Sequence, residues 1–495
     1  MPIMDEPTSL DPQIADSNSE KLVAANCYEG LVRIMADGTI GKGVATDWNI
    51  SDDGLTYTFK LRNNSHWAMF SGHKAVLGEN YEDTFDITVK AEDFKFGIER
   101  TLSEQTGSAN APLFSAVKSI STPDDFTIVF NLSYADDNFL YALTNPGAMP
   151  CDEEFFNLTN GKYGLDAKYL LCNGPFHVSK WTEKTSVKLV KNNEYNGESS
   201  VSPSSVTFYI NNNDSEVADK MNSVTYDVAF LSSSQFSSIE NKKDLNSVAV
   251  QNVTYSFIFN QNDNNYRNKN MRLAFCRSCD TSSLFDSQSD ISKADGIVPP
   301  SCKIGGEDYR NGNAAELLSY DETLAKKNFN DALLELGSSS VETTILCTEQ
   351  YESFVKQMVQ KLQKTLGVKF VSTVKVVSES DLEAAVNDGN YSVAFYPFKA
   401  KSSFAGEIIE GFDQNNIFGY ESDVLSQKIR NIKNNSGSLE GERSAVADAE
   451  NYLVSEAVIM PVFYENSYFV TSKKTSGIYF YSSADNVCFI NAKKS

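Results

Sequence analysis

The sequence predicts a mixed α/β protein, and three observations support this fold class. In the first half of the 495 residues, short segments alternate apolar and polar residues, which is typical of half-buried antiparallel strands. A second strand-rich block runs from Phe176 to Asn260. The last third alternates helical patterns with strand patterns, as βαβ units do.

Three strands and one helix are predicted in the first half. The strand from Leu31 to Met35 precedes an Asp-Gly turn, and the strands from Tyr57 to Arg62 and from Ile128 to Leu132 have a period of two. Between them, the segment from Ala91 to Leu102 places apolar residues four positions apart, which predicts an amphipathic helix.

The second block opens with the turn signal Asn173-Gly174-Pro175. We expect strands over Val187 to Leu189, Val206 to Ile210 and Tyr255 to Phe259 because β-branched and aromatic residues dominate there. Asn and Ser are dense between these strands and mark loops.

The last third contains three predicted helices. The first has capping-box spacing at Ser319 to Glu322 and stops at Gly337. The second ends at Gly367, before a strand from Val368 to Val371. The third lies near Arg443 to Glu456 and precedes a strand from Val458 to Tyr464.

The charge balance argues against two classes of partner. With 43 basic and 66 acidic residues the net charge is −23, which repels phosphate backbones and anionic lipid surfaces. We therefore expect no nucleic acid partner. The acidity is best explained as a means of keeping an exposed protein soluble.

Eight cysteines in 495 residues are too few for a disulfide scaffold, and their positions show no paired spacing. Cys276 and Cys279 form the one CxxC motif, within a segment from Met271 that reads as a helix. Without a second CxxC, small buried thiols explain the pair better than a metal or redox site does. We predict no metal and no cofactor.

No run of about 18 apolar residues is present, so no membrane-spanning segment is predicted. The first residues lack a basic region followed by an apolar one, so no export signal is visible. Either the protein is cytosolic or its signal has been removed from this sequence.

Catalysis has weak support in the sequence. The motifs of serine hydrolases, zinc proteases, P-loop enzymes and dinucleotide-binding enzymes are missing, and the three histidines (His66, His73, His177) share no motif. A secreted hydrolase with paired carboxylates is the remaining enzyme alternative, although carboxylate separation cannot be read from a sequence. We expect a protein that is not an enzyme.

Eight short motifs in a fixed order resemble the family 5 extracellular solute-binding proteins, which include oligopeptide-, dipeptide- and nickel-binding receptors. The resemblance covers nearly the entire chain. The motifs are Glu6 to Pro12, Tyr28 to Val32, Thr58 to Arg62 with Trp67, Val89 to Phe94, Asn173 to Phe176, Lys191 to Tyr195, Met271 to Phe275 with Asp280, and Met460 to Tyr464. The first of these contains Ser9-Leu10-Asp11-Pro12, which we interpret as a corner that stabilises the fold.

The resemblance implies a class II periplasmic-binding-protein fold with two lobes and three domains. The first lobe would combine residues 1–40, 170–262 and 466–495, with residues 41–169 as a small accessory domain. Residues 263–465 would form the second lobe. Chain crossings near Asn260 and Tyr464 would act as the hinge.

The resemblance also implies a function and a ligand site. Such a protein closes two lobes over a peptide or peptide-like ligand and delivers it to the permease subunits of an ABC importer; a peptide or pheromone sensing receptor of the same fold is the alternative. An extended peptide would pair with backbone from each lobe. The expected ligand-binding residues are Glu29, Gly30, Leu31, Asn260, Tyr396, Phe398, Lys399, Lys401, Phe404 and Tyr464. We expect a monomer, located outside the cytoplasm as a lipid-anchored or periplasmic protein.

Two segments depart from the family pattern. The segment from Ala68 to Thr88 is longer than usual, and we expect it to form a surface loop. The second departure is Lys401, which stands where peptide-binding relatives have an Asp that takes the α-ammonium group of the ligand. We therefore hypothesise a ligand with a blocked or anionic group at that end, or an amine held by Glu407 or Glu410.

Overall fold

The structure is a computed structural model that describes residues 1–35, 39–80, 84–136, 138–197, 200–281, 285, 290–399, 404–413, 416–436, 438–481 and 486–495. The chain divides into two compact units, residues 1–249 with 468–495 and residues 250–467. It passes between them within two long strands, β12 (Leu245–Phe259) and β19 (Ile459–Ser472). The division into three domains stays a prediction.

The first unit contains an antiparallel sheet that includes the strands predicted over Tyr57 to Arg62 and Ile128 to Leu132, whereas the strand predicted from Leu31 to Met35 is β2 (Val32–Ile34), which pairs with β3 (Ile40–Lys42). The order of the sheet is β4 (Ala45–Ile50), β5 (Thr56–Leu61), β7 (Thr127–Leu132) and β6 (Val117–Asp124). The predicted helix is confirmed as α4 (Ala91–Leu102), whose Phe94 and Ile98 are fully buried in the same core as Phe59 and Phe130 of the sheet.

A second four-stranded sheet in this unit has the order β1 (Pro2–Ile3), β10 (Ser205–Ile210), β9 (Ser186–Lys191) and β8 (Phe176–Thr182). The short β1 pairs in parallel, and the other neighbours are antiparallel. Helix α1 (Asn18–Cys27) begins with a capping box between Ser17 and Glu20. The strands expected after the Asn173-Gly174-Pro175 turn are confirmed.

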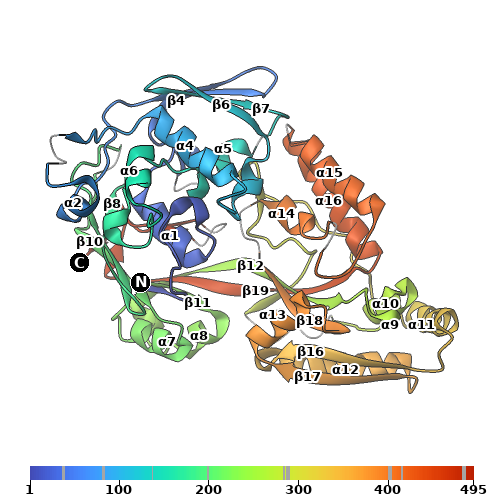
Figure 1. Cartoon of the computed structure of the whole chain (residues 1–495). Helices are drawn as coiled ribbons and strands as arrows, with labels where there is room; N and C mark the ends of the chain where they lie inside the picture. Colours follow the sequence, from blue (N-terminus) through green and yellow to red (C-terminus); the bar gives the residue numbers. More distant parts are fainter. Residues whose placement is uncertain are drawn as a thin grey trace. The chain divides into compact units, whose positions relative to one another are not determined.

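The second unit is a sheet covered by helices on both faces (Figure 1). Its central order is β19, β12, β18 (Val393–Lys399), β16 (Val341–Thr348) and β17 (Phe370–Val377). Buried residues of α10 (Lys269–Arg277), α11 (Glu322–Leu336) and α12 (Glu352–Leu366) form the core on one face. The other core contains buried residues of α13 (Glu379–Asn387), α14 (Ala405–Glu410), α15 (Asp423–Asn434) and α16 (Leu439–Ser455).

The helices and strands predicted in the last third are present, but several boundaries differ. Helix α16 begins at Leu439 rather than near Arg443, and β19 continues to Ser472, beyond the predicted end at Tyr464. Helix α11 takes Asp321 as its N-cap, because the Asp321 carboxylate accepts the amide of Leu324, so the expected cap at Ser319 is wrong. It ends as expected at Gly337, which has a left-handed φ of 63°. The strand expected from Val368 starts only at Phe370. Val368 is 96% exposed, so its apolar side chain was a misleading signal.

The long segment from Ala68 to Thr88 is more than a surface loop, which corrects that expectation. It contains a 3-10 turn over Ser71–His73 and the short helix α2 (Lys74–Leu77). His73 is fully buried, and its Nε2 lies 3.1 Å from the Leu170 carbonyl oxygen. Burial lowers the pKa of His73 to about 4. Part of this segment therefore belongs to the core of the first unit.

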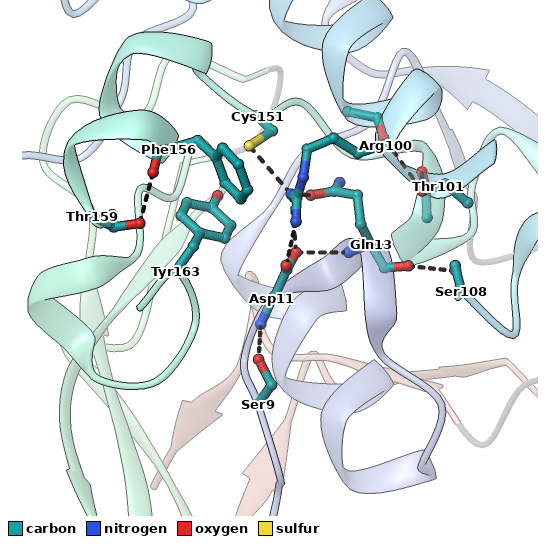
Figure 2. Close-up of polar contacts among 12 residues, drawn as sticks. Ser9, Asp11, Gln13, Arg100, Thr101, Ser108, Cys151, Phe156, Thr159 and Tyr163 are labelled. Carbon is teal, nitrogen blue, oxygen red and sulfur yellow. Dashed lines mark hydrogen bonds and ion pairs between the residues drawn. The ribbon is translucent and has the colours of Figure 1, made fainter. Parts of the chain in front are cut away.

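The early Ser9-Leu10-Asp11-Pro12 motif forms a polar corner (Figure 2). The Asp11 carboxylate accepts the Gln13 amide and pairs with Arg100 of α4, with 2.6 Å between Oδ2 and Nη2. Arg100 also donates to the Gln13 side chain and lies 4.0 Å from the Phe156 ring centroid. This supports the interpretation of the motif as a stabilising corner.

The CxxC motif is split by the end of a helix. Helix α10 stops at Arg277, so Cys276 is helical and Cys279 follows the helix, and both side chains are buried. In the parts of the chain that the structure describes, no three His, Cys, Asp or Glu residues gather as a metal-binding group. Over the same residues, no helix is both long and apolar enough to cross a bilayer.

Candidate ligand-binding site

The expected ligand-pairing segment of the first unit follows α1 directly, and its first residue is held by Asn173. The Glu29 amide donates to Asn173 Oδ1 over 3.0 Å, and Asn173 Nδ2 donates to the Glu29 carbonyl over 2.8 Å. Next to this pair, the Gly174 amide donates to the Cys27 carbonyl over 2.9 Å. A Cβ atom at Gly174 would lie 2.6 Å from the Cys27 carbonyl carbon, so this contact requires glycine.

The Glu29 side chain is 5% exposed, and both of its carboxylate oxygens have polar partners. Arg62 forms an ion pair with one carboxylate oxygen, and the Tyr195 hydroxyl donates to the other over 3.2 Å. Burial, followed by the neighbouring Glu29 charge, raises the pKa of Tyr195. Arg62 is fixed further by donating to the Gly43 carbonyl over 2.6 Å. The carboxylate therefore serves a network that connects three of the family motifs.

Gly30 and Leu31 form irregular backbone rather than a strand, since β2 (Val32–Ile34) begins after them. The Gly30 carbonyl accepts the Val44 amide over 2.9 Å, and the Leu31 carbonyl accepts the amides of Gly43 and Ala45. Leu31 is fully buried. These groups hold the first unit together, and the assignment of Glu29 to Leu31 as ligand-binding residues stays a prediction.

In the second unit, β18 carries the expected segment from Tyr396 to Lys399. Along its whole length it pairs with β12, from Val393 opposite Phe259 to Lys399 opposite Val253. On its other side, the parallel register with β16 covers Val393 and Ala394. The register with β16 therefore ends before the part of β18 that the sequence assigns to the ligand.

The aromatic side chains of this segment are partly buried. The Phe398 ring stacks on Phe412 with centroids 5.9 Å apart, and Tyr396 meets Phe398 edge-on at 5.7 Å. Phe404 lies against Gly406 at the start of α14. Burial raises the pKa of Tyr396, so its hydroxyl stays protonated at neutral pH. Half-buried aromatic rings of this kind can supply apolar contact to a ligand while staying fixed in place.

Asn260 and Tyr464 have contacts that explain them without a ligand. Asn260 Nδ2 donates to the carbonyls of Gly389 and Tyr391, both over 2.8 Å, just before β18 begins. Tyr464 is 2% exposed, and its hydroxyl accepts the Asp295 amide over 3.1 Å. Both therefore work within the core of the second unit, and we leave them out of the site proposed below.

Lys401 lies outside the described residues. The structure does place Glu407 and Glu410, the alternative carboxylates, on α14. Its residues Ile408 and Ile409 are buried in the same core as Phe398.

Sequence reasoning missed Asn173, Arg62 and Tyr195, which hold Glu29 in place. The sequence analysis treats Asn173 as part of a turn, Arg62 as the end of a predicted strand, and all three residues as parts of family motifs. Their presence in three of the family motifs was the one signal that could have grouped them.

Comparison with known proteins gives a consistent result. The family described as bacterial extracellular solute-binding proteins, family 5 middle, matches residues 39–418. The dipeptide-binding protein DppE of Bacillus subtilis is 24% identical over 96% of this chain and 88% of its own length. The oligopeptide-binding protein OppA of the same organism is 27% identical over 74% of this chain and 68% of its own length.

Solved structures share the fold. OppA of Listeria monocytogenes, bound to peptide, superposes with a TM-score of 0.76 at 21% identity, covering 100% of this chain and 98% of that one. A dipeptide-binding protein of Pseudoalteromonas in complex with Met-Leu gives 0.78 at 18% identity, covering 100% and 99%. The two-lobed class II periplasmic-binding-protein fold predicted from the sequence is thereby confirmed. The sequence motifs, the fold and the family match over residues 39–418 agree. This chain belongs to the family 5 bacterial extracellular solute-binding proteins.

Proposed function

We propose that this protein captures short peptides outside the cytoplasm and delivers them to the permease of an ABC importer. The observation that carries the proposal is the register of β18: β12 pairs with all of it, whereas the pairing with β16 covers Val393 and Ala394. The printed names of the relatives, which are dipeptide- and oligopeptide-binding proteins, support peptides as the ligand class.

An extended peptide would add next to β18 along Tyr396 to Lys399. Main-chain hydrogen bonds would supply affinity without selecting a sequence, because every peptide offers the same backbone donors and acceptors. The half-buried rings of Tyr396, Phe398 and Phe404 would contact peptide side chains loosely. No bond is broken in this process, and we propose that the protein has no catalytic activity.

Capture would involve closure of the two units on each other. The chain passes between them at two places, in β12 and β19, so few backbone torsions need to change during a hinge motion. Small-angle scattering should give a monomer with a smaller radius of gyration at saturating peptide. An unchanged radius at saturation would contradict closure.

The decisive experiment uses N-methylated peptides. Isothermal titration calorimetry should compare a peptide that binds with analogues methylated at one backbone amide at a time. Methylation of an amide that pairs with β18 removes a donor and adds bulk, and should weaken binding at least tenfold. If every single methylation is tolerated, strand addition is wrong.

The ligand class has its own test. Protein purified without added ligand is denatured, and the released small molecules are identified by mass spectrometry. A peptide is the expected finding. Release of a sugar, or of a metal ion found by elemental analysis, would contradict the peptide proposal.

A further inference from the structure

Three segments that are far apart in the sequence meet at the surface of the first unit, and each carries two consecutive lysines. The first is the 3-10 turn Lys242–Asp244, which precedes β12. The second is the turn of Lys473 and Lys474 between β19 and β20 (Thr475–Ser476). The third is β23 (Lys493–Lys494). We use the name lysine surface for Lys242, Lys243, Lys473, Lys474, Lys493 and Lys494.

Hydrogen bonds hold the three segments together. The Lys473 amide donates to the Asp244 carbonyl over 2.9 Å, and the Lys473 ammonium group donates to the Lys243 carbonyl over 2.7 Å. The Ser495 amide donates to the Lys474 carbonyl over 2.8 Å, and β20 pairs with β23 in antiparallel register. The fold therefore gathers lysines that no local sequence pattern connects.

The six side chains are exposed, and most of their ammonium groups are available to a partner. Lys494 forms an ion pair with Asp227, with 3.0 Å between Nζ and Oδ1. The Lys242 ammonium group lies 4.6 Å from the centroid of the Phe236 ring. Counting the described residues only, the lysines of this surface with neither an ion pair nor a ring contact are Lys243, Lys473, Lys474 and Lys493.

Neighbouring carboxylates do not cancel this charge. Three acidic side chains, Asp227, Glu240 and Asp244, lie in or beside the three segments, against six ammonium groups. The whole chain has a net charge of −23, which would repel an anionic partner. At physiological ionic strength, however, charges separated by more than a Debye length of about 8 Å are largely screened. The local excess of lysines therefore determines what can approach this surface.

The composition of the lysine surface favours a membrane over a protein as its partner. The three segments contain lysine and no arginine, whereas protein–protein interfaces are enriched in arginine and depleted in lysine. A lysine ammonium group is a hydrated point charge, without the fork geometry by which arginine recognises one carboxylate or phosphate. Clusters of basic side chains instead attract the many negative charges of an anionic lipid surface.

We propose that the lysine surface contacts the anionic headgroups of a phospholipid membrane and orients the first unit on that membrane. The proposal rests on the proposed function only for the location, because a protein that delivers ligands to a permease works beside a membrane. The repulsion expected from the net charge applies to the chain as a whole. The attraction is confined to this surface, so one orientation is favoured.

Such a contact is electrostatic and reversible. Each lysine next to an anionic membrane strengthens binding by about fivefold. The ammonium groups stay hydrated at the headgroups, so no apolar side chain has to enter the bilayer. Binding should therefore depend on the lipid charge and on salt, and should not depend on the peptide ligand.

Flotation of the full chain with lipid vesicles tests the proposal. The protein should float with vesicles of phosphatidylcholine and phosphatidylglycerol and should not float with vesicles of phosphatidylcholine alone. Raising the salt from about 0.15 M to about 1 M shortens the Debye length to about 3 Å and should release the protein.

Charge reversal locates the contact. The test variant combines Lys243→Glu, Lys474→Glu and Lys493→Glu, and should bind the anionic vesicles at least tenfold more weakly than the wild type. The matched control reverses three exposed lysines outside the lysine surface: Lys118→Glu, Lys369→Glu and Lys375→Glu. The two variants have the same net charge, so a difference between them reports the position of the charges. The control should stay within about twofold of the wild type.

Three results would overturn the proposal. They are no binding of the wild type to the anionic vesicles, equal loss of binding in the two variants, and binding only to vesicles that carry the permease, which would identify a protein as the partner. Circular dichroism checks that both variants are folded. Calorimetry with peptide is a separate measurement in which both variants should match the wild type, so failure of the proposed function is recognised independently of the vesicle result.

Discussion

Asn173 pairs with both main-chain polar groups of Glu29, as donor to its carbonyl over 2.8 Å and as acceptor of its amide over 3.0 Å. The two residues are 144 positions apart in the sequence. One side chain thus takes the place of a neighbouring strand for a segment that lies outside regular secondary structure.

Asn173→Ala should therefore destabilise the protein more than the loss of an ordinary hydrogen bond. It leaves a buried amide and a buried carbonyl of Glu29 without their partner, which should lower the free energy of unfolding by about 2–4 kcal/mol. Urea denaturation followed by circular dichroism measures this. Asn196→Ala, which removes an exposed hydrogen bond to the Asn64 carbonyl, should change stability by less than about 0.5 kcal/mol. Equal effects of the two substitutions would contradict the argument.

We expect a larger loss of stability when the ion pair between Asp11 and Arg100 is broken than when Asn173 is replaced. Asp11→Ala leaves the mostly buried Arg100 guanidinium without its carboxylate, which should cost about 3–5 kcal/mol of unfolding free energy. The matched control is Asp331→Ala, which breaks the exposed pair with Lys327 on α11 and should cost about 0.5 kcal/mol or less. Thermal and urea unfolding of the three proteins measure the difference. A loss below 1 kcal/mol for Asp11→Ala would show that the corner matters little.

The buried side chain of His73 should make the stability of the protein depend on pH. Its pKa is lowered from 6.5 to about 4 in the folded protein, so the unfolded chain binds the proton more readily. Stability is fully present above about pH 6.5 and is lost as the pH falls toward 4. Between pH 7 and pH 5 the contribution of His73 should fall by about 2 kcal/mol. His177 also has a lowered pKa and contributes to the same trend.

His73→Gln separates the two histidines. The variant should lose about 2 kcal/mol less than the wild type between pH 7 and pH 5, because His177 titrates in both proteins. Urea denaturation at the two pH values measures this difference. Parallel stability profiles for wild type and variant would show that His73 does not titrate as its burial implies.

Helices and strands could be predicted from the sequence where they depend on a local residue pattern. Contacts between residues far apart in the sequence could not be predicted. Helix α4 was predicted to the residue, and Phe94 and Ile98, two of the apolar residues spaced four apart, are buried. The start of β17 was wrong because Val368 is apolar but exposed. The pairing of Glu29 with Arg62 and Asn173 spans 33 and 144 residues, and no local periodicity reports such contacts.

Substitution of Phe398 tests the part of the proposed ligand site that lies in the second unit. Phe398→Ala removes a half-buried ring next to the proposed peptide position and should weaken peptide binding about tenfold, or about 1.4 kcal/mol. Tyr320→Ala, at a ring that is 45% exposed and precedes α11, should leave affinity unchanged. Calorimetry measures both, and urea denaturation checks that Phe398→Ala is folded. Unchanged affinity in the folded variant would remove Phe398 from the site.

Lys401 provides a prediction that rests on the sequence alone. The resemblance implies that peptide-binding relatives use an Asp here to hold the ligand's α-ammonium group, so a Lys would place two positive charges together. At about 4 Å and an effective dielectric constant near 20 they repel by about 4 kcal/mol, which corresponds to about three decades of affinity. The wild type should therefore prefer an N-acetylated peptide to the same peptide with a free amine. Lys401→Asp should reverse that preference. Calorimetry with the two peptides and the two proteins measures all four affinities. Tight wild-type binding that requires the free amine, with no gain in Lys401→Asp, would show that the amine is held elsewhere, and Glu407→Gln and Glu410→Gln would then identify the carboxylate.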